Sequence, residues 1–163
     1  MKRIIIHWTG GAYEPNTLEF NHYHYLVNGN GLVFKGKYTP EDNLCCTGDK
    51  YAAHTGGGNT GSIGVAMCGM ANYKPKKGIS STQYPLTKIQ CERTFKLVAE
   101  LVKKYNIPVT RATVMTHYEF GKANPNTSSA GKIDIVCLPE YLISNEKIGD
   151  FIRSKVRWYS SNS

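Results

Sequence analysis

Three residues that lie far apart in this sequence together have the chemistry to bind a divalent metal ion. His7 follows the apolar run Ile4–Ile6, His117 follows a second strand-like run at residues 114–116, and Asp134 is flanked by isoleucines. Zinc prefers imidazole and carboxylate ligands, and three protein ligands leave the fourth tetrahedral position open for water. Two histidines and one aspartate therefore indicate a hydrolytic metal site rather than a structural one.

Each of these residues also has a simpler interpretation. A histidine at the end of a buried strand is often only a hydrogen-bonded core residue, and the 110 positions from His7 to His117 are not a local metal motif. Asp134 is an ordinary surface carboxylate in the simplest view, although its apolar neighbours favour a buried, charge-compensated one. If the segment is extended, Lys132 points to the same side as Asp134 and its ammonium can stabilise an oxyanion; a solvent-exposed lysine is the alternative.

Short apolar runs bounded by turn signals predict the strands that must position these residues. The first run is rich in β-branched residues and ends at a double glycine, and an Asn-Gly-Asn turn signal predicts a hairpin. Because α/β sheets place their sites at the carboxyl ends of strands, we expect His7 and His117 at one edge of a sheet. The predicted strands are residues 2–8, 23–27, 31–35, 62–70 and 111–116.

Helical periodicity predicts two long helices. The first covers residues 88–105 and begins with a capping box formed by Thr87 and Gln90. The residues expected on its buried face are Ile89, Leu97, Val98, Leu101, Val102 and Tyr105. The second covers residues 145–158, and the residues expected on its inner side are Ile148, Phe151, Ile152, Lys155 and Val156. The other segments are predicted to be a loop or short helix at 12–21, a long functional loop at 37–61 and a polar excursion at 121–131.

These elements together predict an α/β fold in which a central mixed β-sheet is flanked by helices and the metal lies in a surface cleft. A chain of 163 residues fits one domain, here residues 1–163, with a core that needs no disulfide staples. No internal repeat or linker divides it. The five cysteines form no C-x-x-C pair, which suits reduced thiols.

The charge of the chain favours anionic partners. Its net charge is +8, with a local cluster at Lys74, Lys76 and Lys77. No basic helix or aromatic RNA-binding motif accompanies the cluster, so specific nucleic-acid binding is not expected and a solubilising surface explains it equally well. No apolar stretch approaches the roughly 20 residues of a membrane span, and the apolar run after Met1-Lys2-Arg3 is too short for an export signal.

Four segments, in order, resemble the zinc-dependent N-acetylmuramoyl-L-alanine amidases of the type 2 amidase and peptidoglycan-recognition-protein family, and in particular bacteriophage endolysins. The resemblance runs along nearly the full length of the chain. It rests on Ile6-His7-Trp8-Thr9-Gly10-Gly11; on Tyr23-His24-Tyr25 with Asn28-Gly29-Asn30-Gly31; on Ala53-His54-Thr55 with Asn59 and Ser62-Ile63-Gly64-Val65; and on Thr116-His117-Tyr118-Glu119 with Gly131-Lys132-Ile133-Asp134-Ile135.

The resemblance implies roles for seven residues. It implies His7, His117 and Asp134 as ligands of one zinc ion and Lys132 as the residue that polarises the scissile carbonyl. Tyr23 matches a tyrosine that assists catalysis, with a buried cross-strand tyrosine as the competing account. His54 and Asn59 match positions beside the substrate groove, with a loop histidine of no function as the alternative for the first.

One departure from the family pattern leaves the general base unidentified. Some relatives carry a glutamate in the strand where this chain has Ala66. Glu119 is a possible substitute, but it follows His117 so closely that a supporting or helix-capping role is the better expectation.

The function implied by the resemblance is hydrolysis of the amide bond between N-acetylmuramic acid and L-alanine in peptidoglycan, by a phage or prophage endolysin. We expect a monomer that remains in the host cytoplasm before release and then acts on the cell wall, in the periplasm if the host is Gram-negative. Its basic surface would favour contact with an anionic wall or outer membrane. The alternatives are a non-catalytic peptidoglycan-binding module and a cytosolic amidase that recycles muropeptides.

Overall fold

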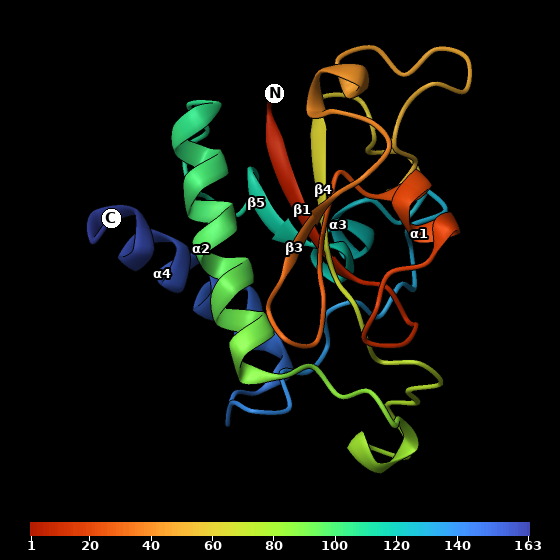
Figure 1. Cartoon of the computed structure of the whole chain (residues 1–163), viewed down its shortest axis with the longest axis vertical. Coiled ribbons are helices and arrows are strands. Elements are labelled where there is room, and N and C mark those ends of the chain that lie inside the picture. Colours follow the sequence, from red (N-terminus) through yellow and green to blue (C-terminus); the bar gives the residue numbers. More distant parts are fainter.

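A mixed sheet of five strands forms the centre of the structure, a computed structural model that describes residues 1–163 (Figure 1). The strand order is β3-β2-β4-β1-β5, with β3 antiparallel to β2 and the other neighbours parallel. This arrangement confirms the predicted α/β fold with a central mixed sheet. The strands are β1 (Arg3–Trp8), β2 (Tyr25–Val27), β3 (Val33–Lys35), β4 (Ser62–Met67) and β5 (Val114–Thr116).

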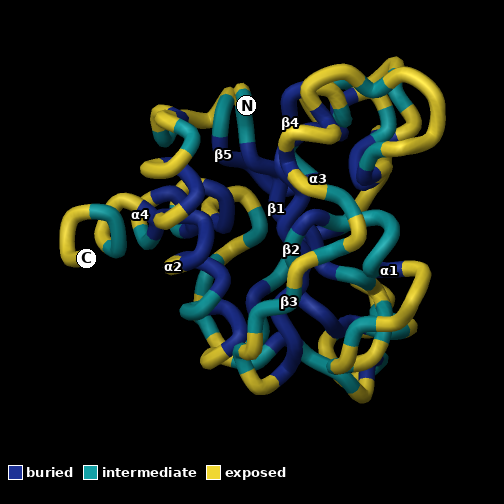
Figure 2. The backbone as a smooth tube through the Cα atoms, turned by 45° about the horizontal axis from the view of Figure 1, so that its top comes forward, coloured by how far each residue is buried: buried dark blue, intermediate teal, exposed yellow.

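Strand β1 lies between β4 and β5, and its position explains its composition. Ile4, Ile5 and Ile6 have no exposed surface, as expected for a parallel strand covered on both faces. Figure 2 shows β1 and its neighbours as the most deeply buried part of the chain. In the parallel register Ile6 pairs with Thr116, so the carboxyl ends of β1 and β5 meet at one edge of the sheet. The residues that follow these two strands are therefore neighbours in space.

Helices cover both faces of the sheet. On one face α2 (Lys88–Lys104) and α4 (Ile148–Ser161) lie side by side, and on the other lie α3 (His117–Ala123) and, farther out, α1 (Thr17–His22) (Figure 1). Short 3₁₀ turns occupy Pro40–Asn43, Ile79–Ser81 and Asn145–Lys147. None of the helices combines the length with the hydropathy that a membrane span requires.

The capping box predicted for α2 is present, but one residue of its predicted buried face is wrong. The Thr87 hydroxyl accepts from the Gln90 N–H, and the Gln90 side chain accepts from the Thr87 N–H. Ile89, expected inside, is 62% exposed. The buried stripe runs through Cys91 and Phe95, and two residues of helix turn Ile89 by about 200° away from Cys91. Four of the other predicted residues are confirmed as buried, and Tyr105 is half-buried.

The last helix begins at Ile148 and continues to Ser161, slightly beyond the predicted end. Ile148, Ile152 and Val156 are buried in the main core. Phe151 and Lys155 are half-buried, and the Lys155 ammonium lies 2.9 Å from the Glu92 carboxylate on α2. The predicted inner face is therefore confirmed.

Three expectations about loops and strand lengths need correction. All five strands are shorter than predicted: β2, β3 and β5 begin two or three residues late, at Tyr25, Val33 and Val114, β4 ends at Met67, and β1 lacks only its first predicted residue. Residues 121–123, expected at the start of the polar excursion, belong to helix α3. Residues 132–138 form no strand, because Gly131 turns the chain with φ of 83° and the following backbone pairs with no neighbouring strand. The parity argument that placed Lys132 and Asp134 on one side of a strand therefore does not apply.

Candidate metal centre

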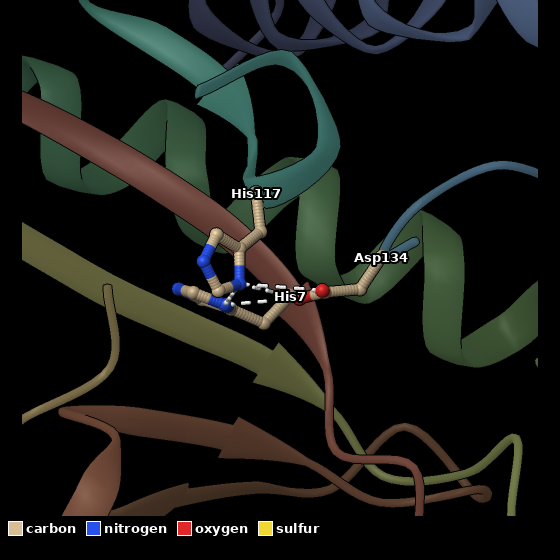
Figure 3. Close-up of side chains that lie close together, drawn as sticks. All are labelled: His7, His117 and Asp134. Carbon is tan, nitrogen blue, oxygen red and sulfur yellow. Dashed lines mark hydrogen bonds and ion pairs between the residues drawn. The ribbon is translucent and has the colours of Figure 1, made fainter. Parts of the chain in front are cut away.

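The structure brings His7, His117 and Asp134 together where β1 and β5 end (Figure 3). The Nδ1 atom of His7 lies 3.1 Å from Nδ1 of His117 and 3.0 Å from Oδ2 of Asp134. The third edge, from His117 Nδ1 to Asp134 Oδ2, is 3.2 Å. All three residues are buried. Their predicted convergence is confirmed.

This triangle fits a tetrahedral zinc ion with one open position. Ligand atoms about 2.1 Å from a tetrahedral zinc ion are about 3.4 Å from one another, close to the observed edges. Two imidazole nitrogens and one carboxylate oxygen are also the ligand set of a catalytic zinc site. His117 and Asp134 line a cleft that gives access from solvent, and His7 is buried beside them.

The local sequence explains how each candidate ligand is held. Side chains alternate along β1, so that Ile4, Ile6 and Trp8 join the main core while His7 faces the α3 side. His117 is the first residue of α3, and the capping box of Thr116 and Glu119 fixes that helix end. Asp134 lies on the irregular segment after Gly131, where its carbonyl oxygen accepts from the Tyr118 N–H at 2.5 Å.

The surroundings favour the protonation states that a metal site requires. Burial lowers the pKa of His7, against the raising effect of the neighbouring Asp134 carboxylate. Burial alone would raise the pKa of Asp134, but the adjacent imidazoles of His117 and His7 outweigh it and the net pKa is lowered. A neutral imidazole and an ionised carboxylate are the forms that bind metal.

The cleft beside the triangle has a volume of about 450 Å³ and contains both predicted catalytic side chains. Lys132 is exposed at its edge, close enough that its charge contributes to lowering the pKa of His7. Tyr23 is a half-buried residue at the end of α1, with its ring centroid 5.2 Å from that of His7. Burial and then the charge of Asp134 raise the pKa of Tyr23, so the Tyr23 side chain remains a phenol at neutral pH. The alternative of a buried cross-strand tyrosine is wrong, because Tyr23 precedes β2.

His54 and Asn59 also line the cleft, but their polar atoms are engaged within the protein. The His54 Nδ1 atom lies 3.1 Å from Nε2 of His7, on the side of that ring away from the triangle. The Asn59 Oδ1 atom accepts from the N–H groups of His54 and Thr55 at 3.0 and 2.8 Å. Their roles in substrate binding stay predictions, whereas their contacts show that they shape the loop behind His7.

Glu119 does not face the cleft. Its carboxylate accepts from the Thr116 N–H at 3.1 Å and from both terminal nitrogens of Arg153 at 3.0 and 2.9 Å. The capping role expected for Glu119 is confirmed, and its ion pair occupies the oxygens that a general base would need. Asp134 is the only carboxylate that lines the cleft.

Ser129 is a site residue that the sequence did not reveal. It is fully buried, and its hydroxyl lies 3.0 Å from Nε2 of His117. It belongs to a segment rich in Asn, Ser and Thr, where no spacing or motif distinguishes one hydroxyl from the others.

Comparisons with known proteins agree with this fold. The family profile described as N-acetylmuramoyl-L-alanine amidase matches residues 1–132. Among solved structures, PlyL is 21% identical with a TM-score of 0.52, over 95% of this chain and 82% of that chain. A mutant form of PlyL is 22% identical with a TM-score of 0.54, over 96% of this chain and 84% of that chain. The PlyG catalytic domain is 19% identical with a TM-score of 0.51, over 98% of this chain and 84% of that chain. At these identities the likeness to the solved structures is one of fold, and no curated protein matches the chain.

Proposed function

The chain belongs to the N-acetylmuramoyl-L-alanine amidase family, and from that membership we propose that it is a zinc-dependent hydrolase of bacterial peptidoglycan. The bond cleaved is the amide between the lactyl group of N-acetylmuramic acid and L-alanine. The observation that carries this proposal is the buried triangle of His7, His117 and Asp134 beside an open cleft.

The residues of the cleft divide the chemistry between them. The triangle would hold the zinc ion, which when bound supplies Lewis-acid activation of water and of the carbonyl group. Lys132 reaches the cleft from its edge, where its ammonium stabilises the oxyanion that develops when the carbonyl carbon becomes tetrahedral. Tyr23 contributes a protonated phenol that orients the scissile group through a hydrogen bond.

The biological role that best suits this enzyme is that of a phage or prophage endolysin. The paired segments at residues 116–119 and 131–135 resemble the ends of phage amidases, and both contribute to the triangle. The net charge of +8 favours contact with the anionic cell wall. Equal turnover of intact sacculi and soluble muropeptides would instead favour a recycling amidase.

The decisive test uses purified sacculi and the zinc-loaded protein. We expect new amino groups, identified as N-terminal L-alanine, to appear at a rate proportional to protein concentration. Asp134→Ala should abolish this release, whereas Asp150→Ala, which removes an exposed carboxylate on α4, should not. Binding to sacculi without release of L-alanine amino termini would contradict the assignment as an enzyme and favour a non-catalytic binding module.

A further inference from the structure

Each candidate metal-binding imidazole has a second polar contact, on the ring nitrogen that faces away from the triangle. Nε2 of His117 lies 3.0 Å from the hydroxyl of Ser129, and Nε2 of His7 lies 3.1 Å from Nδ1 of His54. All four residues are buried. These outer contacts decide which ring nitrogen carries the proton.

The contact behind His117 ends at a backbone carbonyl. The Ser129 hydroxyl lies 2.7 Å from the carbonyl oxygen of Gly56, which can only accept, so Ser129 donates its single proton there. Its oxygen then has only lone pairs to offer to His117, so Nε2 of His117 is the donor. Because a neutral imidazole carries one N–H, Nδ1 of His117 presents a bare lone pair to the triangle.

The contact behind His7 ends in the same way. Nε2 of His54 lies 3.3 Å from the carbonyl oxygen of Ser62, which places the proton of His54 on Nε2 and leaves its Nδ1 as an acceptor. The Thr55 hydroxyl lies 2.7 Å from this Nδ1 and 3.4 Å from Nε2 of His7. Whether His7 donates directly to His54 or through this hydroxyl, its own proton is on Nε2.

The packing around His54 holds the ring in this orientation. A Cβ at Gly64 would lie 2.5 Å from Cγ of His54, so the imidazole occupies the space that any larger residue would fill. Asn59 also binds the backbone N–H of His54. The ring is therefore restrained on both its backbone and its face.

We propose that Ser129 and His54 are positioning residues that hold the protons of His117 and His7 on Nε2, so that both bare Nδ1 atoms face the metal. Three acceptors, two lone pairs and the Asp134 carboxylate, then converge at 3.0–3.2 Å, an arrangement that a cation satisfies. The assignment rests on the proposed zinc site. The hydrogen bond from Ser129 to Gly56 also links two loops beside the cleft, the one at Gly56 and the one at Ser129, to the candidate ligand His117.

The first test reads the tautomers directly. Nitrogen-15 spectra of the metal-free protein at pH 8 distinguish the protonated from the bare ring nitrogen of each histidine. We expect Nε2–H in both His7 and His117. In Ser129→Ala, only His117 should change and populate both tautomers. Nδ1–H in both rings of the natural protein would overturn the proposal.

The second test measures zinc affinity by competition with a chelator. Loss of such a supporting hydrogen bond typically weakens metal binding 10–100-fold, and we expect this loss for Ser129→Ala and for His54→Leu. Ser129→Thr and His54→Asn, which keep a hydroxyl and an acceptor, should recover most of the affinity. Ser154→Ala is the matched control, since that exposed serine also donates to a carbonyl, that of Phe151, but far from the cleft.

Zinc affinity in Ser129→Ala and His54→Leu equal to that of the natural protein would also overturn the proposal. Both measurements are made without substrate, so they stand or fall independently of amide cleavage. A protein that binds zinc with these tautomers but releases no L-alanine would contradict the proposed function alone.

Discussion

The proposed zinc ion is expected to stabilise the fold as well as to serve catalysis, because its three candidate ligands come from segments that meet only in the folded state. His7 lies on β1, His117 begins α3 and Asp134 lies on a loop. An unfolded chain cannot present these groups together, so zinc would bind the native state almost exclusively. Binding of this kind raises the free energy of unfolding by mass action.

The size of the effect follows from the ligand concentration. At free zinc about 1,000 times its dissociation constant, the free energy of unfolding rises by about 4 kcal/mol. For a chain of 163 residues, 1 kcal/mol changes the melting temperature by roughly 2–4 °C, so chelation should lower it by roughly 8–16 °C. The Asp134→Ala protein loses one of three ligands, and its melting temperature should hardly respond to zinc.

Calorimetric melting with zinc and with excess chelator measures these changes. Asp150→Ala provides the control, since Asp150 pairs with Arg111 and Arg153 on the surface and should leave the zinc response intact. Equal melting temperatures of the natural protein in zinc and in chelator would refute the reasoning. An undiminished zinc response in Asp134→Ala would refute the assignment of that ligand.

Three further predictions concern single side chains. Lys132→Ala should keep its zinc but lose about 10²–10³-fold in turnover, and a zinc-loaded variant with normal kcat would exclude the oxyanion role. Burial lowers the pKa of His24 from 6.5 to about 4, despite its hydrogen bond to Asn43, so the unfolded chain binds more protons between these pH values. The contribution of His24 to stability is therefore complete above pH 6.5 and falls by about 3 kcal/mol as the pH drops to 4, so urea titrations should find the loss of stability smaller by that amount in His24→Asn. Arg153→Met leaves Glu119 without its partner and should cost about 3 kcal/mol in urea unfolding while zinc affinity stays within about threefold; an unchanged midpoint would show that the ion pair contributes nothing.

Local patterns were sufficient to predict the five strands and the two long helices of the fold, though not their exact bounds. The run Ile4–Ile6 predicts a strand covered on both faces, because only such a strand buries three consecutive β-branched residues. The Thr87–Gln90 capping box predicts the start of α2, since both groups of the box lie within one turn. The ordered motifs that include His7 and His117 also resembled the family to which the chain belongs.

Only the tertiary structure decided how these parts meet. Pairing of β1 with β5 brings His7 beside His117, and no local pattern encodes which strands become neighbours. The positive φ of Gly131 directs Asp134 into the centre along an irregular path that has no periodicity to detect. Ser129 acquires its contact with His117 in the same way, from the course of a loop. Side-chain periodicity reports burial along one element, whereas a site assembled from several elements depends on hydrogen bonds between backbone segments that are distant in sequence.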